Sequence, residues 1–202
     1  MKKARRPYVL KARAERAAET RARIVDAIMH LHGEVGPRAT TVSAIAKRAG
    51  VERLTVYRHF ADEAEMFGAC SHRYMELNPP PRPDDWTGET DPILRTRAGL
   101  TAIFAFFSRT APMFSRIYRD EDEFPVLAKI MNEFGAYLSS LADDLASAWP
   151  SDSRRARRLA TLRHAVKFQT WQALETDGVA NNQKVHLALE WIAAGPVALA
   201  SR

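Results

Sequence analysis

The sequence predicts an all-α fold of about nine helices, in which a three-helix amino-terminal domain precedes a larger helical domain. Apolar residues recur at three- and four-residue steps through most of the 202 residues, as they do on amphipathic helices. We find no convincing period-two alternation, and no Asn-Gly or Asp-Gly hairpin lies between apolar runs. Proline and glycine gather at a few breaks, which divide the chain into helical stretches.

The first helix is expected from about Ala17 to Glu34. Its apolar residues form one stripe that consists of Ile24, Ala27, Ile28, Leu31 and Val35. Gly36 suits a left-handed terminal turn, and Pro37 prevents the helix from continuing. A short second helix is expected from about Val42 to Ala49, where the Thr41 hydroxyl can cap the first turn.

The later helices are bounded by the remaining breaks. The segment Asn78-Pro-Pro-Pro-Arg-Pro83 is expected to be a stiff extended linker, because three consecutive prolines cannot lie within a helix. The expected helices run, in order, from about Arg53–Phe60, Asp62–Leu77, Pro92–Thr110, Pro112–Arg119, Pro125–Ala148, Asp152–Asp177 and Asn182–Ser201.

Positive charge is concentrated at the front of the chain. Residues 1–60 hold 14 Lys and Arg against 5 Asp and Glu, a net charge of +9, whereas residues 61–202 carry a net charge of −3. A basic segment joined to a slightly acidic body suggests that the front meets a polyanion. The alternative is a solvated basic tail, since six of the 14 basic residues precede residue 14.

Several function classes find no support in the residues. The single cysteine, Cys70, excludes an internal disulfide and a thiolate metal cluster. No apolar run approaches the roughly 18 residues of a membrane span, and charged residues follow the basic start, so we expect neither membrane association nor export but a cytoplasmic protein. The six histidines show no metal-ligand spacing, and no nucleophile elbow, dinucleotide fingerprint or phosphate loop occurs. We therefore expect no enzyme activity, no cofactor and no metal ion.

The segment from Thr40 to Phe60 has the pattern of a helix-turn-helix. Its buried positions are expected to be Val42, Ile45, Ala46, Ala49, Val51, Val56 and Phe60. Gly50 occupies the turn, where a positive φ angle disfavours any residue with a Cβ. The amino-terminal end of the second helix is then left outside, and in a recognition helix that end enters the major groove.

Candidate DNA contacts follow from this placement. Arg53 can reach guanine O6 and N7, Thr55 a base edge or a phosphate, and Leu54 a thymine methyl group. Tyr57 and Lys47 are better placed for phosphates, which fix register without reading sequence. The full candidate set is Thr40, Thr41, Lys47, Arg53, Leu54, Thr55, Tyr57, Arg58 and His59. A plain αα-hairpin with a glycine turn is the alternative, which the joint pattern disfavours.

This segment and the helix before it resemble the TetR (tetracycline-repressor-like) family of transcriptional regulators. The resemblance is carried by Arg23-Ile-Val-Asp-Ala-Ile28, Gly36, Thr40-Thr-Val-Ser-Ala-Ile-Ala-Lys-Arg-Ala-Gly-Val51 and Thr55-Val-Tyr-Arg-His-Phe60. It implies a three-helix DNA-binding head, a ligand-binding body, homodimerisation through the last two helices and release of operator DNA when a ligand binds. We expect a basic flexible arm over residues 1–16, a helix-turn-helix domain over 17–61 and a ligand-binding and dimerisation domain over 62–202.

Two residues depart from the family pattern. Glu52 stands where relatives usually have a Ser or another good helix cap, and Glu63 stands where they commonly have a Lys that meets the DNA backbone. One phosphate contact is therefore expected to be missing. The basic arm from Lys2 to Arg16 could compensate by lying along the minor groove or the backbone, which is a hypothesis.

From residue 92 on, the sequence contains no recognised motif, so only its composition is informative. An apolar pocket with a few polar groups in its wall, such as the tyrosine hydroxyls, His164 and Gln169, would suit a small hydrophobic or aromatic effector. The candidate ligand-binding residues are Phe104, Phe107, Met113, Tyr118, Phe134, Tyr137, His164 and Gln169. The alternative for each aromatic residue at helical spacing is that it belongs to the core.

The last two expected helices carry apolar stripes that could form a dimer surface. One consists of Leu159, Leu162, Val166 and Gln169, and the other of Val185, Leu189, Ile192 and Pro196. Pairing two copies would give a four-helix arrangement, whereas the alternative is that the stripes pack inward within one subunit.

Two clusters of like charge remain, Arg154–Arg158 and Asp120–Glu123. A solvated surface is expected for both, with mutual pairing, or an anionic ligand for the arginines, as the alternative. A helical enzyme or adaptor without operator binding, and a DNA-binding dimer without ligand sensing, remain as alternative functions.

Overall fold

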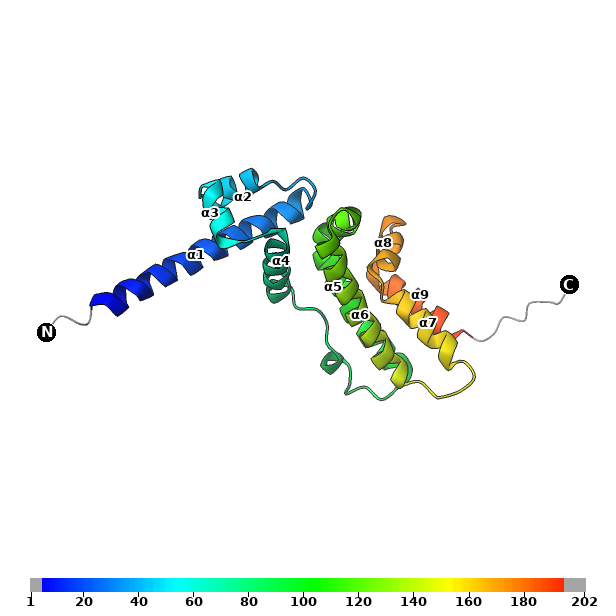
Figure 1. Cartoon of the computed structure of the whole chain (residues 1–202). Helices are drawn as coiled ribbons and strands as arrows, with labels where there is room; N and C mark the ends of the chain where they lie inside the picture. The colour runs from blue at the N-terminus through cyan, green and yellow to red at the C-terminus, as the bar shows by residue number, and fades with distance from the viewer. Residues whose placement is uncertain (1–4, 195–202) are drawn as a thin grey trace. The chain divides into compact units, whose positions relative to one another are not determined.

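A computed structural model describes residues 5–194 of the chain and the side chains of residues 11–194. Within residues 5–194 there are nine α-helices, two short 3-10 helices and no strand, which confirms the expected all-α fold (Figure 1). The elements are α1 (Arg5–Glu34), α2 (Val42–Ala49), α3 (Arg53–His59), α4 (Glu63–Leu77), η1 (Pro83–Asp85), α5 (Pro92–Asp120), η2 (Glu121–Glu123), α6 (Pro125–Ser147), α7 (Arg155–Ala165), α8 (Phe168–Thr176) and α9 (Asn181–Ala193).

The described chain divides into two compact units. The first extends to Pro79 and includes Ser115–Ile130, whereas the second contains Pro80–Phe114 and continues from Met131. The unit that holds the helix-turn-helix is therefore larger than the expected domain over residues 17–61, because it also contains α4, the end of α5 and the start of α6.

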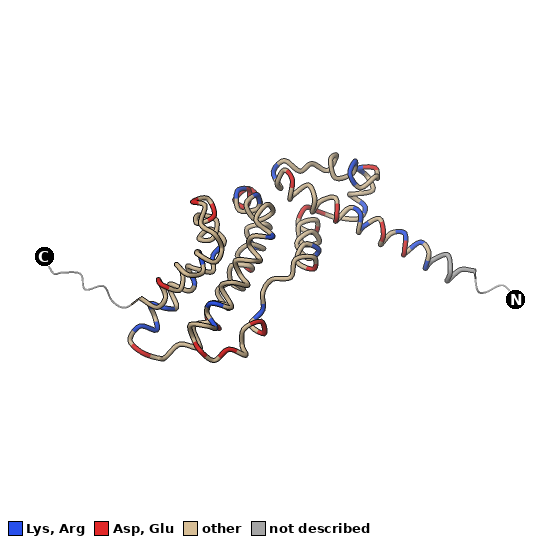
Figure 2. The backbone as a smooth tube through the Cα atoms, turned by 180° about the vertical axis from the view of Figure 1, so that it is seen from behind, with Lys and Arg blue, Asp and Glu red and all other residues tan. Residues whose placement is uncertain are grey.

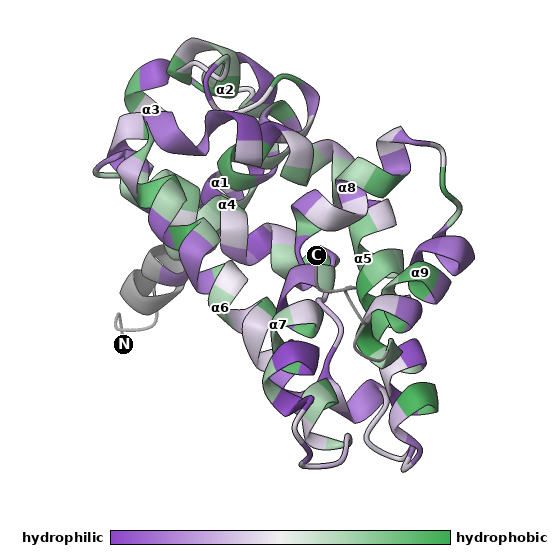
Figure 3. Ribbon diagram, turned by 90° about the vertical axis from the view of Figure 1, so that its right-hand side faces the viewer, coloured by the Kyte–Doolittle hydropathy of each residue, from purple (hydrophilic) through white to green (hydrophobic). Residues whose placement is uncertain are grey.

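In the first unit, α1 packs against both α2 and α4. The helices alternate between apolar and polar residues along their length, as Figure 3 shows. The buried apolar side chains of this unit include Ile24, Ala27, Ile28, Ile45, Val56, Phe60 and Phe67. Burying such side chains supplies the main driving force for folding a small helical unit.

Helix α1 begins at Arg5 rather than at the expected Ala17. Residues 5–16 of the expected flexible arm are thus helical, while residues 1–4 lie outside the described residues. For residues 11–16 the physical reason is composition, because residues 11–22 consist almost entirely of Ala, Arg, Glu and Lys, which favour helix. Lys11 and Glu15 also form an ion pair at helical spacing, with 4.0 Å between Nζ and Oε1.

Helices α5 and α6 approach closely in the second unit. A Cβ atom added to Gly99 would lie 2.6 Å from a methyl carbon of Leu145, so any larger residue there would displace the Leu145 side chain. Beside the crossing, the Trp149 indole donates a hydrogen bond of 2.9 Å to the Thr96 hydroxyl. The remaining helices of the unit contact one another, with α7 touching both α8 and α9.

Proline 112 does not end a helix, contrary to the expected pair Pro92–Thr110 and Pro112–Arg119. Helix α5 runs through Pro112 to Asp120. A proline inside a helix removes the one hydrogen bond that its missing N–H would donate, but it does not prohibit helix on both sides. The buried side chains along α5, among them Phe106, Phe107 and Ile117, supply packing that can offset this loss.

The expected single helix over Asp152–Asp177 is instead two helices, α7 and α8. Lys167, between them, has an extended backbone with φ −74° and ψ 140°. The Thr170 hydroxyl donates a 2.7 Å hydrogen bond to the His164 carbonyl, which the break leaves without its helical partner. Neither glycine nor proline marks this break, so the sequence pattern did not predict it.

The apolar stripes expected to pair two copies are buried within the single chain. Their buried members are Leu162, Val166, Val185, Leu189 and Ile192. Leu159 is half-buried, Gln169 is exposed, and Pro196 lies outside the described residues. The alternative of inward packing is thus the one that the structure has, and these buried side chains are not available to a second copy.

The two charge clusters are not simply solvated surface. Asp120 is 1% exposed and Arg158 is 3% exposed. Each has a partner in its own neighbourhood, because Arg119 donates to Asp120 and Arg158 donates to Asp152 at 2.7 Å. The expected solvated positions are therefore wrong for Asp120 and Arg158, since local partners compensate the burial of their charges.

Among residues 5–194, none of the helices combines the length and the hydropathy that a bilayer-spanning segment requires.

Candidate nucleic-acid interface

The helix-turn-helix is defined by its two ends and its turn. The Thr41 hydroxyl caps α2 by accepting a 3.2 Å hydrogen bond from the Ala44 N–H. Gly50 ends α2 with φ +65° and ψ 42°, the left-handed conformation that glycine adopts without strain. Glu52 precedes α3 in an extended conformation and makes no side-chain capping bond.

The inner side of the motif is packed. Its buried residues are Ile45, Ala46, Ala49, Val56 and Phe60, while Val42 and Val51 are half-buried. The Arg21 guanidinium of α1 lies 4.7 Å from the centre of the Phe60 ring, so α1 covers the end of α3. The orientation of α3 is therefore fixed by its apolar side.

The outer side of α3 is open. Leu54 is 68% exposed and Tyr57 is 51% exposed, which is unusual for side chains of this size. Arg53 and Arg58 are also exposed, and neither forms an ion pair within residues 11–194. Arg53 and Tyr57 are four positions apart, about one helical turn, and so are Leu54 and Arg58. The four side chains therefore lie on one side of the helix. Thr55 and His59, at the margins of this face, are half-buried.

The candidate phosphate contacts before and within α2 lie at or near the surface. The half-buried Thr40 donates its hydroxyl hydrogen to the Gly36 carbonyl at 2.8 Å. Thr41 and Lys47 are exposed, and the Lys47 ammonium forms no ion pair within the side chains that the structure describes. The adjacent Arg48 differs, because it makes a bidentate ion pair with Glu34 at 2.5 and 2.7 Å. Lys47 is thus the more available cation of the two.

Helix α1 carries a further basic face that the helix-turn-helix pattern did not include. Figure 2 marks Lys and Arg along this helix. Arg13, Arg16 and Arg23 are exposed and stand three or seven positions apart, so they share one side of the helix. Arg23 lies on the side of the turn, because its Nη1 would be 3.8 Å from a Cβ on Gly50. The periodicity of the arginines is the signal that could have revealed this face.

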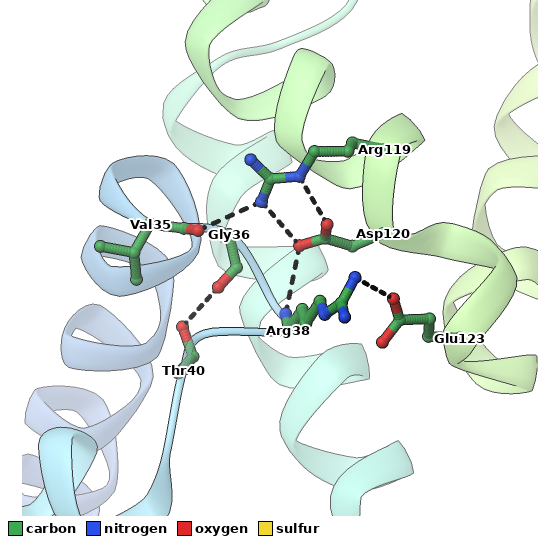
Figure 4. A network of polar contacts seen from close by, with 7 residues as sticks. All are labelled: Val35, Gly36, Arg38, Thr40, Arg119, Asp120 and Glu123. Carbon is green, nitrogen blue, oxygen red and sulfur yellow. Dashed lines mark hydrogen bonds and ion pairs between the residues drawn. The ribbon is translucent and has the colours of Figure 1, made fainter.

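A polar network joins the loop between α1 and α2 to the end of α5 (Figure 4). Both oxygens of the Asp120 carboxylate accept hydrogen bonds from Arg119, at 2.7 Å and 3.0 Å. The same carboxylate accepts the backbone N–H of Arg38 at 3.1 Å. These bonds, with the Arg119 guanidinium first, lower the pKa of Asp120 below its usual value. The charged cluster Asp120–Glu123 was visible in the sequence, but its partner loop was not.

The candidate ligand residues of the second unit are packed among aromatic rings. Phe134 lies 5.0 Å from Phe114 and 6.5 Å from Tyr137, measured between ring centres. Phe107 lies 5.4 Å from Phe168. Phe107, Met113 and Phe134 are all less than one-tenth exposed. These contacts fit the core alternative as well as they fit the wall of a pocket.

The other candidate ligand residues are more dispersed. Phe104 lines a groove of about 410 Å³ together with Asn182, Val185 and other residues of α9. The Tyr137 hydroxyl donates a 2.7 Å hydrogen bond to the Pro81 carbonyl of the linker. Of the remaining three, His164 and Gln169 are exposed, and Tyr118 belongs to the first compact unit.

The described residues show no group of three or more His, Cys, Asp or Glu side chains placed to hold a metal ion.

Three helices with an exposed recognition-type helix, a glycine turn and a capped second helix define the helix-turn-helix class of proteins. Residues 24–70 match the model of the bacterial regulatory proteins of the tetR family. The amino-terminal segment is thus similar to the DNA-binding domain of the tetR family, and the resemblance inferred from the sequence is confirmed for this part of the chain.

A curated relative supports the same region. The HTH-type transcriptional regulator AcrR of Shigella flexneri is 40% identical over 53 residues, which cover 26% of this chain and 25% of that regulator. The likeness therefore spans only a quarter of the relative's length and does not extend to its remaining part.

Solved structures resemble the chain over most of its length. A TetR-like transcriptional regulator from Rhodococcus sp. RHA1 has a TM-score of 0.61 at 17% identity, with 86% of this chain and 93% of that chain covered. The multidrug binding protein EbrR, solved in complex with imidazole, has a TM-score of 0.57 at 16% identity, with 88% and 92% covered. At these identities the likeness shows a shared fold alone.

Proposed function

We propose that the chain is a DNA-binding transcriptional regulator that acts as a homodimer, with α3 of each copy in the major groove of one half of a palindromic operator. The observation that carries this proposal is the outer face of α3. Arg53 and Arg58 are exposed without intrachain carboxylate partners, and the large side chains of Leu54 and Tyr57 stand beside them. Burying that face against DNA would give these side chains partners that the chain itself does not supply.

The proposed roles divide between reading and positioning. Arg53 would read guanine, Leu54 a thymine methyl group, and Thr55 a base edge at the margin of the face. The residues proposed to hold phosphates are Thr40, Thr41, Lys47, Tyr57, Arg58 and His59. Glu63, at the first position of α4, supplies no positive charge, so the phosphate contact usual for relatives is expected to be absent.

The basic face of α1 would supply additional phosphate contacts. Arg23 lies beside the turn of the motif, and Arg13 and Arg16 share its side of α1 by their helical spacing. This refines the hypothesis of a flexible arm, because a helix holds its cations at fixed spacing, whereas a flexible arm must be ordered when it binds.

A homodimer is proposed because one α3 of seven residues reads too few base pairs for specificity, whereas two heads read a palindrome. The second copy must contact faces other than the buried stripes of α7 and α9. Trp191 on α9 is 40% exposed, and exposed aromatic side chains are common in protein interfaces.

We further propose that the chain acts as a repressor that a small, largely apolar ligand releases from its operator. Two features support this, the aromatic side chains of α5 and α6 and the fold shared with EbrR, which is described as a multidrug binding protein. The candidate contacts are those named from the sequence, with His164 and Gln169 less favoured because they are exposed.

The test starts by selecting binding sites from random duplex DNA with the full chain. Fluorescence anisotropy on the selected duplex then compares Arg53→Ala and Thr55→Ala with Arg97→Ala, which removes an exposed arginine from the second unit. We expect Arg53→Ala to weaken binding about 10- to 100-fold, as the loss of one base contact does, while Arg97→Ala binds normally. Failure to select any sequence, or equal losses in all three variants, would contradict the proposal. Release of the duplex by hydrophobic compounds tests the effector part separately.

A further inference from the structure

We infer that Asp120 is a positioning residue for the proposed DNA-binding surface, because its carboxylate fixes the loop between α1 and α2 without touching DNA itself. This inference rests on the proposed function. The loop runs over residues 35–41 and contains Thr40 and Thr41, two of the candidate phosphate contacts. Asp120 is the last residue of α5, 82 positions away from Arg38 in the chain.

The geometry of the carboxylate is the first step. Asp120 is 1% exposed, so its charge is removed from water and needs partners. Arg119 supplies a bidentate pair, with Nε donating to Oδ1 at 2.7 Å and Nη2 donating to Oδ2 at 3.0 Å. Oδ2 also accepts the backbone N–H of Arg38 at 3.1 Å (Figure 4). The carboxylate thus binds the main chain of the loop rather than a side chain that could swing away.

The loop is held on its other side as well. Arg119 donates from Nη2 to the Val35 carbonyl at 3.2 Å, so one guanidinium binds both Asp120 and the end of α1. Gly36 has φ +91°, and a Cβ there would clash with Arg119 Nη2 and Asp120 Oδ2. Only glycine allows this close approach.

Thr40 and Thr41, two of the candidate phosphate contacts, are also held by hydrogen bonds. Thr40 donates from its hydroxyl to the Gly36 carbonyl at 2.8 Å, and its N–H donates to the Pro37 carbonyl at 3.0 Å. Thr41, the next residue, caps α2 through its hydroxyl. Asp120 thus binds the Arg38 amide, while Thr40 binds the carbonyls of Gly36 and Pro37 just before it, so both ends of the loop segment before α2 are held by hydrogen bonds.

A loop fixed before binding does not have to lose conformational freedom when it meets DNA. Removing the Asp120 carboxylate should release the Arg38 amide and leave the loop to be ordered by the DNA. Because Asp120 contacts no phosphate, its loss should weaken binding without changing the number of counterions released. A weaker affinity with an unchanged salt slope distinguishes a positioning residue from a DNA contact.

The experiment compares Asp120→Ala and Asp120→Asn with the wild-type full chain on its selected duplex. Asp120→Asn keeps an oxygen acceptor and nearly the same volume, so it remains informative should the alanine variant fail to fold. Arg38→Ala is the matched control, since it removes the exposed ion pair with Glu123 but keeps the backbone N–H that Asp120 binds. The readouts are affinity, its dependence on salt, hydrogen exchange of the loop amides and the free energy of unfolding.

We expect Asp120→Ala to weaken DNA binding about tenfold, the scale of ordering one or two loop residues, with an unchanged salt slope. The Arg38 amide should exchange faster in Asp120→Ala, less so in Asp120→Asn and not in Arg38→Ala. The inference would be overturned by wild-type affinity in Asp120→Ala, by a reduced salt slope, or by unchanged protection of the Arg38 amide. A wild-type chain that selects no DNA would overturn the proposed function, whereas a wild-type chain that binds its duplex together with any of these three results would overturn this inference alone.

Discussion

The Sγ atom of Cys70 lies 3.7 Å from Nδ1 of His32, in the buried layer between α4 and α1. The His32 ring stacks on Phe67, with 5.3 Å between ring centres and 30° between their planes. Burial lowers the pKa of His32 to about 4 and raises the pKa of Cys70 to about 12. The fold therefore buries a neutral imidazole beside a neutral thiol between α1 and α4.

Because the His32 imidazole is buried in its neutral form, we predict that the folded chain loses stability in mild acid. The pKa of His32 is 6.5 when unfolded and about 4 when folded, so the unfolded chain binds more protons between these values. The free energy of unfolding should fall as pH drops from 6.5 towards 4, by about 3 kcal/mol in total. Urea unfolding of wild type and His32→Phe over this range measures the difference. His72→Ala, at an exposed position, should keep the wild-type dependence, and an equal slope in His32→Phe would contradict the prediction.

Because the Cys70 thiol is buried, we predict that it reacts slowly with alkylating reagents. Only the thiolate reacts with alkylating reagents, and both burial and a pKa of about 12 suppress it at neutral pH. We expect iodoacetamide to leave the folded chain unmodified at pH 8 over hours and to modify it within minutes in concentrated urea. Mass spectrometry measures both. Rapid labelling of the folded chain would show that the layer between α1 and α4 opens readily.

The helix-turn-helix could be predicted from the sequence because its determinants are local. Thr41 caps a helix that starts at the next residue, and Gly50 ends it in a left-handed turn. Val56 and Phe60 are four positions apart and are buried on the same side of the motif. Such features lie within one or two helical turns, which is the range that periodicity reports.

The features that escaped prediction depend on distant partners. The hydrogen bond between Asp120 and Arg38 joins residues 82 positions apart. The local sequence around either residue gives no indication of the other as its partner. The break between α7 and α8 has no glycine or proline, and the His164 carbonyl beside it accepts both the Lys167 N–H and the Thr170 hydroxyl. Charge clusters are usually solvated, so the burial of Asp120 becomes visible only with its partners in place.

The two positive-φ glycines of the head predict different costs for the same substitution. Gly50→Ala meets open space, with its nearest neighbour, Arg23, at 3.8 Å, so it should lose about 1–2 kcal/mol for the left-handed backbone alone. Gly36→Ala carries a similar backbone cost and also displaces Arg119 and Asp120. We expect Gly36→Ala to be clearly the more destabilising in urea unfolding and to expose the Arg38 amide to exchange. Equal losses in both variants would show that the polar network adds nothing to the loop.

The basic face of α1 predicts a change in the salt dependence of DNA binding. If Arg13 and Arg16 each meet a phosphate, the double variant Arg13→Ala/Arg16→Ala should lower the slope of log K against log salt by about two, because each contact releases nearly one counterion. Lys11 is the matched control, since it lies two positions before Arg13, on the other side of the helix, and already pairs with Glu15. Lys11→Ala should leave the slope within experimental error of wild type. A slope that falls in proportion to the number of charges removed, whatever their face, would mean that α1 acts through net charge and not through contacts at fixed positions.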